Sequence, residues 1–324
     1  MVRMILLIVA VVLVALILLF LAGPRVATDT TITFDETAIG DDPVAWLAAR
    51  EADVPNLRAE LAKEIVWADP VSKARTPLAI VYVHGFSASK AELRPVPDRV
   101  AAEIGANVFY TRLAGHGRDG PAMAEASLND WINDYAEAMA IGRAIGDRVV
   151  VIATSTGAAL ATWAATQPEL SRDVAGYVLI SPNYGVQAPG AWLLTMPWGR
   201  QIAEMVIGPE RGFEPVNEEH ARYWTTRYPT AATLPMAALT KLARQSVVER
   251  AHAPALFIFS DADAVVRPEL TRDIAARWGK PHETMIVESS DDPSNHIIAG
   301  DAISPSTTTL FAGRISEWIS ELRR

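Results

Sequence analysis

The chain begins with an uninterrupted apolar run and continues with buried runs that alternate with amphipathic segments. Residues 4–22 carry no polar or charged side chain. A membrane-spanning helix needs about 17–25 apolar residues, whereas the apolar region of a cleaved signal peptide is about 7–15 residues long. The run therefore predicts an uncleaved single-span anchor over residues 1–25, with a cleaved signal peptide as the alternative. Pro24, directly after Ala22-Gly23, argues against cleavage there.

The charges on either side of this run indicate its orientation. Arg3 precedes it, and Arg25 follows it, with a series of aspartates from Asp29 to Asp42 further on. Positive charge tends to stay on the cytoplasmic side, so the weak bias puts the amino terminus in the cytoplasm. We therefore expect a membrane-anchored protein whose main domain, residues 26–324, lies on the extracytoplasmic side.

Beyond the anchor, the pattern predicts one α/β domain. Strand-like apolar runs occur at 64–67, 78–83, 107–110, 148–153, 174–181, 255–260 and 285–287, and helical segments at 42–47, 93–104, 128–145, 158–165 and 310–322. Residues 27–39 are rich in threonine and are expected to form an extended tether. Segments 64–67 and 78–83 are expected to pair with each other. The alternation predicts a mostly parallel sheet flanked by helices.

Residues 183–245 depart from this alternation. They contain Trp192, Trp198 and Trp224, three tyrosines and several prolines, and few runs of strand length. Such a segment fits a mostly helical cap inserted between the strands at 174–181 and 255–260. Its aromatic residues either shape a binding pocket or pack the cap helices together.

Composition excludes several classes of function. The net charge is −9 and basic residues do not cluster with aromatic ones, so nucleic acid is not an expected partner. The chain has no cysteine, which excludes a thiol nucleophile, a disulfide framework and a cysteine zinc site. The six histidines lack an H-E-x-x-H arrangement. We therefore expect neither a metal nor another cofactor.

A serine occupies a tight turn between a strand and a helix. Thr154-Ser155-Thr156-Gly157 follows the strand at 148–153 and precedes the helix at 158–165. In a nucleophile elbow, the residues two before and two after the nucleophile must be small. Ala153 and Gly157 meet this requirement, although the usual motif has glycine at both positions. The context predicts that Ser155 is a nucleophile.

An acid and a histidine follow Ser155 in the chain. Asp261 and Asp263 lie in the loop after the strand at 255–260, where either can orient an imidazole or cap the helix that begins near Pro268. His296 ends a polar loop after the last strand. A histidine that titrates near neutrality suits a general base, although exposed loop histidines are also common.

Two glycine-containing loops upstream complete the pattern. His84-Gly85-Phe86 follows the strand at 78–83, and an L-A-G-H-G sequence occupies 113–117. Together with T-S-T-G, the D-x-V-V sequence from Asp263 and the late His296, these motifs resemble the α/β-hydrolase superfamily. Within it, the chain is similar to the monoacylglycerol lipase and carboxylesterase-like branch, also described as serine aminopeptidase S33-like. The resemblance covers residues 60–324, and Ala153 is its departure from the usual elbow.

The resemblance implies an α/β-hydrolase fold with a Ser155, His296 and Asp263 triad. The D-x-V-V loop favours Asp263 as the acid, with Asp261 as the fallback. The backbone N–H groups of Phe86 and Thr156 are the expected oxyanion-hole donors. His84 and His116 are expected to be structural.

The expected activity is hydrolysis of carboxylic esters, with lipid-like or short acyl esters as small-molecule substrates. A peptidase, thioesterase or acyltransferase would use the same triad, and a non-catalytic binding protein would use the same fold. The cap at 183–245 would act as a lid. Trp192 and Trp198 are the candidate substrate-binding residues, placed either in the acyl channel or against lipid.

Overall fold

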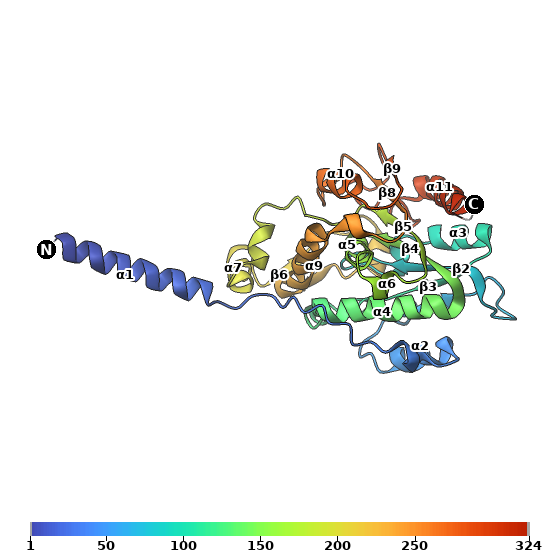
Figure 1. The fold of residues 1–324 in the computed structure, drawn as a ribbon, viewed down its shortest axis with the longest axis horizontal. Coiled ribbons are helices and arrows are strands. Elements are labelled where there is room, and N and C mark those ends of the chain that lie inside the picture. Colours follow the sequence, from blue (N-terminus) through green and yellow to red (C-terminus); the bar gives the residue numbers. More distant parts are fainter. Residues whose placement is uncertain (1, 323–324) are drawn as a thin grey trace.

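The computed structural model describes residues 2–322 and consists of a sheet between two layers of helices, with a long N-terminal helix projecting from the body (Figure 1). The main sheet contains β1 (Glu64–Val66), β2 (Thr76–Val83), β3 (Asn107–Tyr110), β4 (Gly146–Thr154), β5 (Val174–Ile180), β8 (Ala255–Phe259) and β9 (His282–Ile286). A separate antiparallel pair contains β6 (Glu210–Gly212) and β7 (Arg227–Pro229).

The α-helices are α1 (Val2–Leu21), α2 (Pro43–Ala52), α3 (Val96–Ile104), α4 (Leu128–Ile145), α5 (Ser155–Ala164), α6 (Pro168–Ser171), α7 (Gly199–Ile207), α8 (Glu218–Tyr223), α9 (Thr233–Gln245), α10 (Pro268–Ala276) and α11 (Pro305–Glu321). Short 3-10 turns are η1 (Glu36–Ile39), η2 (Ala59–Leu61), η3 (Lys90–Glu92), η4 (Pro121–Ala124), η5 (Ala191–Thr195), η6 (Thr230–Ala232) and η7 (Val248–Arg250).

The sheet has the order β1-β3-β2-β4-β5-β8-β9. β1 pairs antiparallel with β3, and the other neighbours pair in parallel, as the sequence predicts for most of the sheet. The expected pairing of 64–67 with 78–83 is wrong, because Ile65 lies opposite Phe109 of β3. The reason is burial: β2 is almost wholly buried and belongs in the centre of the sheet, whereas the half-buried β1 tolerates an edge.

Side chains of each central strand alternate between two apolar cores. In β2, Ile80 and Tyr82 join the core formed with α3 and α11, whereas Val81 and Val83 join the core formed with α4, α5 and α9. This period of two follows from the pleat of a strand. Both faces of the sheet are covered, so the carboxyl ends of the strands are the place where a site opens.

Helix boundaries follow local signals. The helix predicted to begin after Ser127 is α4, and Ser127 and Asp130 form a capping box at its start. The helix predicted from Leu93 begins instead at Val96, because the ring of Pro97 fits only the first turn of a helix.

The N-terminal helix is exposed along its whole length. α1 has a mean hydropathy of 3.6 and is long and apolar enough to cross a membrane. The segment after it is extended, as expected, but it lies against α4 instead of hanging free. Asn133 Oδ1 accepts hydrogen bonds from the amides of Thr33 and Phe34, at 2.7 and 2.9 Å. The indole of Trp46 on α2 donates to Glu137 of α4 at 2.9 Å.

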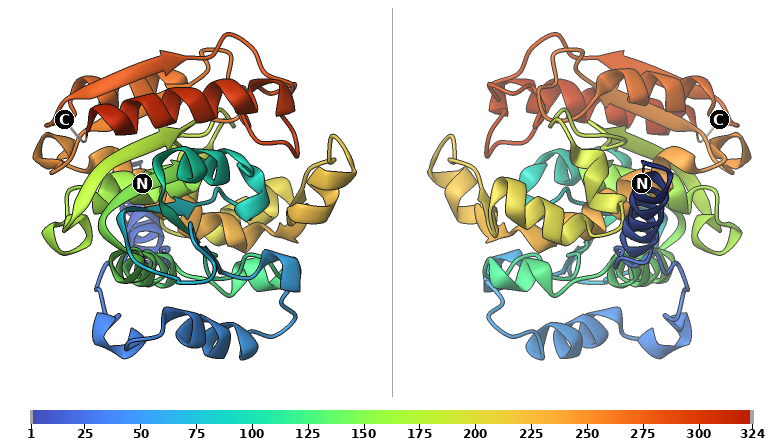
Figure 2. Two further views of the ribbon diagram at one scale, coloured as in Figure 1. Left: turned by 90° about the vertical axis from the view of Figure 1, so that its right-hand side faces the viewer. Right: turned by 90° about the vertical axis from the view of Figure 1, so that its left-hand side faces the viewer.

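Residues 183–245, which we call the cap segment, lie between β5 and β8 and contain η5, α7, α8, η6, α9 and the β6–β7 pair. In Figure 1, α7 lies between the end of α1 and the sheet. The right panel of Figure 2 looks along α1 and shows α7 on the face from which α1 projects.

Candidate active site

Ser155 is the first residue of α5 and directly follows β4. Its φ is 51°, in the left-handed region that non-glycine residues rarely adopt. A Cβ atom on Gly157 would lie 2.4 Å from the carbonyl oxygen of Val83. Only glycine therefore allows α5 to approach β2 so closely, and the turn holds the serine at the carboxyl edge of the sheet.

Three side chains from separate parts of the chain form a continuous series of hydrogen bonds. His296 Nε2 lies 3.0 Å from Ser155 Oγ, and His296 Nδ1 lies 2.8 Å from Asp263 Oδ2. An ionised carboxylate only accepts, so Nδ1 carries the proton and Nε2 is free to accept the serine hydroxyl proton. All three residues are buried.

Of the two candidate aspartates, Asp263 contacts the imidazole and Asp261 does not. Asp263 Oδ1 accepts from the amides of Val265 and Val266, both at 2.8 Å, which fixes the direction of the carboxylate. Asp261 is exposed and forms an ion pair with Arg272.

The environment of His296 favours the charged imidazole. Burial by itself would lower the pKa of His296, but the hydrogen bond and negative charge of Asp263 outweigh it, and Glu92 and Asp292 add to the rise. The pKa of His296 therefore lies above its ordinary value, and an imidazolium formed during a reaction would be stabilised.

The Phe86 amide is a free donor in the loop that approaches the nucleophile, since a Cβ atom on the preceding Gly85 would lie 3.1 Å from Ser155 Cβ. Within residues 2–322 it has no hydrogen-bond acceptor, whereas the preceding amide of Gly85 donates to Glu92 at 2.7 Å. Thr156 is the second residue of α5, so its N–H precedes the first i→i−4 bond of the helix. The positive end of the α5 dipole also favours negative charge beside this donor.

His84 and His116 tie the H-G-F loop to the L-A-G-H-G loop. His84 donates from Nδ1 to the Gly85 carbonyl and accepts at Nε2 from the amide of Leu113 at 3.1 Å. His116 accepts at Nε2 from the amide of Ser87 at 3.0 Å. Burial lowers the pKa of His84 to about 4 and that of His116 well below its ordinary value. Both rings are neutral and serve to position the loops.

A sequence profile of the Alpha/beta hydrolase family matches residues 80–300. The chain belongs to the α/β-hydrolase family. The match spans the H-G-F loop, the elbow, the Asp263 loop and His296, which is the part of the chain that forms the site.

Lipases are among the similar proteins. The thermostable monoacylglycerol lipase of Bacillus sp. (strain H-257) is 26% identical over 201 residues, covering 62% of this chain and 76% of that protein. A structure from work on LipS and LipT, two metagenome-derived lipolytic enzymes, is 22% identical with a TM-score of 0.64, covering 83% and 99% of the two chains. The Saccharomyces cerevisiae monoglyceride lipase, solved as a soluble variant with a substrate analogue, is 11% identical with a TM-score of 0.61, covering 81% and 91%. The expected fold and hydrolase branch are confirmed.

Two buried acids support the site of this hydrolase and were not predicted. Glu92 Oε2 accepts from Gly85 N and from the Tyr82 hydroxyl at 2.8 Å, and that hydroxyl lies 3.2 Å from Thr154 Oγ1. Asp292 accepts from the amides of His296 and Ile297, at 3.0 and 2.8 Å.

A signal for Asp292 is present in the sequence. The Asp-Pro-Ser order at 292–294 favours an Asx turn, and the Ser294 hydroxyl donates to Asp292. Burial would raise the pKa of Asp292, but these hydrogen bonds hold it below its ordinary value. Glu92 offers no comparable signal, because its partners depend on how the H-G-F loop folds back.

The two candidate substrate-binding tryptophans of the cap, Trp192 and Trp198, occupy different environments. Trp192 on η5 is largely exposed, and the indole of Trp198 is directed to the carbonyl oxygens at the end of α1. The cap segment begins at the nucleophile, since the amide of Asn183 donates to the carbonyl oxygen of Ser155 at 3.0 Å.

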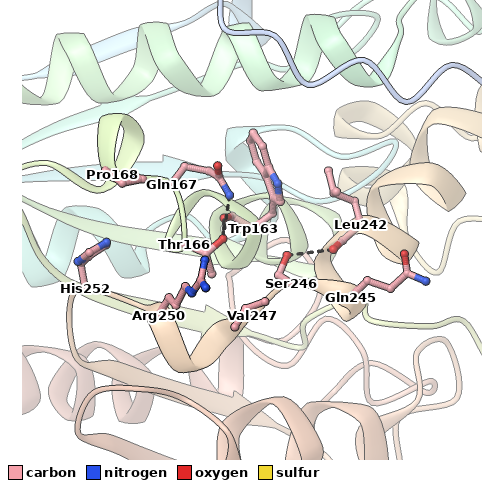
Figure 3. Close-up of a pocket in the computed structure, with 10 residues that line it drawn as sticks. All are labelled: Trp163, Thr166, Gln167, Pro168, Leu242, Gln245, Ser246, Val247, Arg250 and His252. Carbon is pink, nitrogen blue, oxygen red and sulfur yellow. Dashed lines mark hydrogen bonds between the residues drawn. The ribbon is translucent and has the colours of Figure 1, made fainter.

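An open cavity of about 730 Å³ lies at the opposite end of α5 from Ser155. Figure 3 shows it lined by Trp163 near the end of α5, Gln167 in the segment after α5, Leu242 on α9 and Arg250 on η7. Eight residues of helix separate Ser155 from Trp163, which is a rise of about 12 Å. This cavity is therefore not where the nucleophile acts.

Proposed function

We propose that this α/β hydrolase is a serine hydrolase of carboxylic esters with lipid-like or short acyl chains. The observation that carries the proposal is the chain of hydrogen bonds from Asp263 through His296 to Ser155, at 2.8 and 3.0 Å. The named activities of the similar proteins support an ester as the scissile bond.

In this proposal, the ester carbonyl carbon is attacked by Ser155 Oγ while His296 Nε2 takes the hydroxyl proton. The new negative charge falls on the carbonyl oxygen, where the amides of Phe86 and Thr156 would donate to it. His296 then gives the proton to the departing alcohol, which leaves an acyl-enzyme. A water molecule attacks next, with His296 again as the base, and releases the carboxylic acid. Asp263 holds the imidazole tautomer throughout.

We also propose a division of the chain into an anchor, residues 1–25, and a hydrolase domain, residues 26–324. The cap segment would form the lid, with Trp192 and Trp198 as candidate substrate contacts. Its attachment at Asn183, beside Ser155, supports access to the nucleophile from the cap side.

Retention of α1 as a membrane anchor is part of the proposal, with the hydrolase domain on the extracytoplasmic side. The mature protein is then expected to begin at or near Met1 and to stay in the membrane fraction after a carbonate wash. A mature N-terminus near Val26 would identify a cleaved signal peptide instead.

The function is tested with Ser155→Ala in the full-length chain. We expect this variant to keep its thermal midpoint, to lose labelling by a fluorophosphonate and to lose hydrolysis of a p-nitrophenyl ester series. Ser320→Ala, at a serine on α11, is the matched control and is expected to keep both the labelling and the ester hydrolysis. Wild-type turnover in purified Ser155→Ala would reject the proposal. The ester series, assayed with the wild-type chain, reports the preferred acyl length.

A further inference from the structure

The end of α1 is held by the cap segment. The last carbonyl groups of a helix have no partner within it. Trp198 supplies one: its Nε1 donates to the carbonyl oxygens of Phe20 and Leu19, at 3.1 and 3.4 Å. Its backbone amide donates to the carbonyl oxygen of Pro24 at 2.8 Å. One cap residue therefore binds the last turn of α1 and the chain just beyond it.

This junction is tightly packed and depends on residue types. Gly23 is buried, and a Cβ atom there would lie 2.0 Å from Trp198 Nε1. Trp198 itself has φ 63°, which a non-glycine residue adopts at a cost. The contact requires glycine at position 23 and a strained backbone at Trp198, so it is a specific contact.

A second attachment holds the chain further along, after the end of α1. The chain from Pro24 onward runs to α4, where Asn133 accepts from the amides of Thr33 and Phe34. The side-chain amide of Asn129 donates to the carbonyl oxygen of Thr31 at 2.9 Å. Held at Trp198 and again on α4, α1 has a defined direction relative to the body.

Exposed apolar side chains lie on the elements that flank Trp198. Trp192 on η5 is 64% exposed, and Met205, Val206 and Ile207 at the end of α7 are 83%, 69% and 45% exposed. We call these four residues the interfacial patch. In Figure 2, right panel, α7 lies on the face from which α1 points toward the viewer. η5 and α7 are in contact with each other, and exposed apolar side chains on neighbouring elements indicate an interaction surface.

We propose that α1 and the cap segment form one membrane-binding unit, in which Trp198 holds the anchor and the interfacial patch enters the lipid headgroup region. The inference rests on retention of α1, but it does not depend on ester hydrolysis. Its consequence is that the cap, and with it the side of the molecule that carries Ser155, faces the bilayer.

Helix length places the patch at the membrane surface. The 20 residues of α1 rise about 30 Å, close to the hydrocarbon thickness of roughly 30 Å. The end of α1 at Leu21 is then at the boundary of the bilayer, where tryptophan side chains are enriched. Trp198 contacts that end directly, so the neighbouring patch meets headgroups and not bulk water.

The absence of cysteine allows a direct test. Single-cysteine variants Trp192→Cys and Met205→Cys of the full-length chain, made in the Ser155→Ala background, carry a polarity-sensitive fluorophore in phosphatidylcholine vesicles. We expect blue-shifted emission and quenching by lipid-attached nitroxides. Val71→Cys in the turn between β1 and β2 and Leu310→Cys on α11, at positions 92% and 58% exposed, are the controls and are expected to remain unquenched. Equal, water-like emission at all four positions would overturn the proposal.

The role of the junction is tested with Gly23→Ala in the Met205→Cys background. We expect the variant protein to stay in the vesicles while the label loses its lipid quenching. Gly313→Ala, where a Cβ atom meets open space, is the matched control. Unchanged quenching in Gly23→Ala would reject the coupling of anchor and cap. A spectral shift that grows with protein density in the vesicles would identify a second copy of the chain on the patch, and would also reject the proposal.

Discussion

Both oxygens of the Asp263 carboxylate are in use, one on His296 and one on two loop amides. Asp263→Asn keeps the shape of the side chain but presents an amide that favours the wrong imidazole tautomer. We expect a loss in kcat of about 10⁴-fold, the known magnitude of this effect. Asp261→Asn breaks only an exposed ion pair with Arg272, worth about 0–1 kcal/mol, and is expected to have nearly normal turnover. A larger loss at Asp261 in steady-state assays would reverse the assignment.

The pH dependence of the reaction follows from the protonation of His296. The base must be neutral, and its pKa lies above the ordinary value because Asp263 outweighs the effect of burial. Activity is therefore absent at low pH and rises as the pH passes the raised pKa, so the acid limb of kcat/KM is expected to have its midpoint above about 6.5. A pH–rate profile of the wild-type chain with its midpoint below that value would contradict this.

Glu92 is expected to act on His296 through its charge. The carboxylate adds to the rise in the pKa of His296, and Glu92→Gln keeps an acceptor for Gly85 N while removing that charge. We expect the acid limb of kcat/KM to move to lower pH. Glu317→Gln on α11, a largely exposed position, is the control and should leave the limb unchanged. If the acid limb of kcat/KM is the same in Glu92→Gln as in the wild-type chain, Glu92 has a purely structural role.

At the scale of elements, the contact between α5 and β2 sets the position of the nucleophile. In Gly157→Ala the added methyl meets the Val83 and His84 carbonyl oxygens at 2.4 and 2.5 Å, so α5 must move away. Overpacking of this kind costs about 1–3 kcal/mol. A displacement of 1 Å can lower the rate by about 10²-fold. We expect a lower thermal midpoint and a loss of kcat, with Gly313→Ala as the neutral control; normal turnover would show that the elbow is more adaptable.

The sequence predicted these elements to the extent that local pattern determines them. Buried apolar runs identified the strands, and Ser127 identified the start of α4. The edge position of β1 was missed, because pairing is decided by burial across the whole sheet. The hydrogen-bond partners of Ser155 followed the expected chain order. The contacts of Glu92 with Gly85 N and of Trp198 with the carbonyl oxygens ending α1 were missed, since these partners are backbone atoms without a sequence signature.

At the scale of the whole molecule, no member of the proposed triad lies in the anchor. Removal of residues 1–24 takes away α1 and its contacts with Trp198 but leaves the segment bound to α4. The truncated protein is expected to be soluble and to hydrolyse a short, water-soluble ester with a kcat close to that of the full chain. Sedimentation and steady-state assays check this. A well-folded but inactive product would show that α1 contributes to the site itself.

The direction in which α1 leaves the body has a kinetic consequence. With a retained anchor, the cap lies against the bilayer and the protein searches for substrate in two dimensions. The quantity that governs its encounters is then the mole fraction of ester within the membrane, not the amount per volume of solution. Inert lipid added at constant total ester would slow the full-length protein, because each molecule remains confined to its own leaflet and its substrate becomes sparser there.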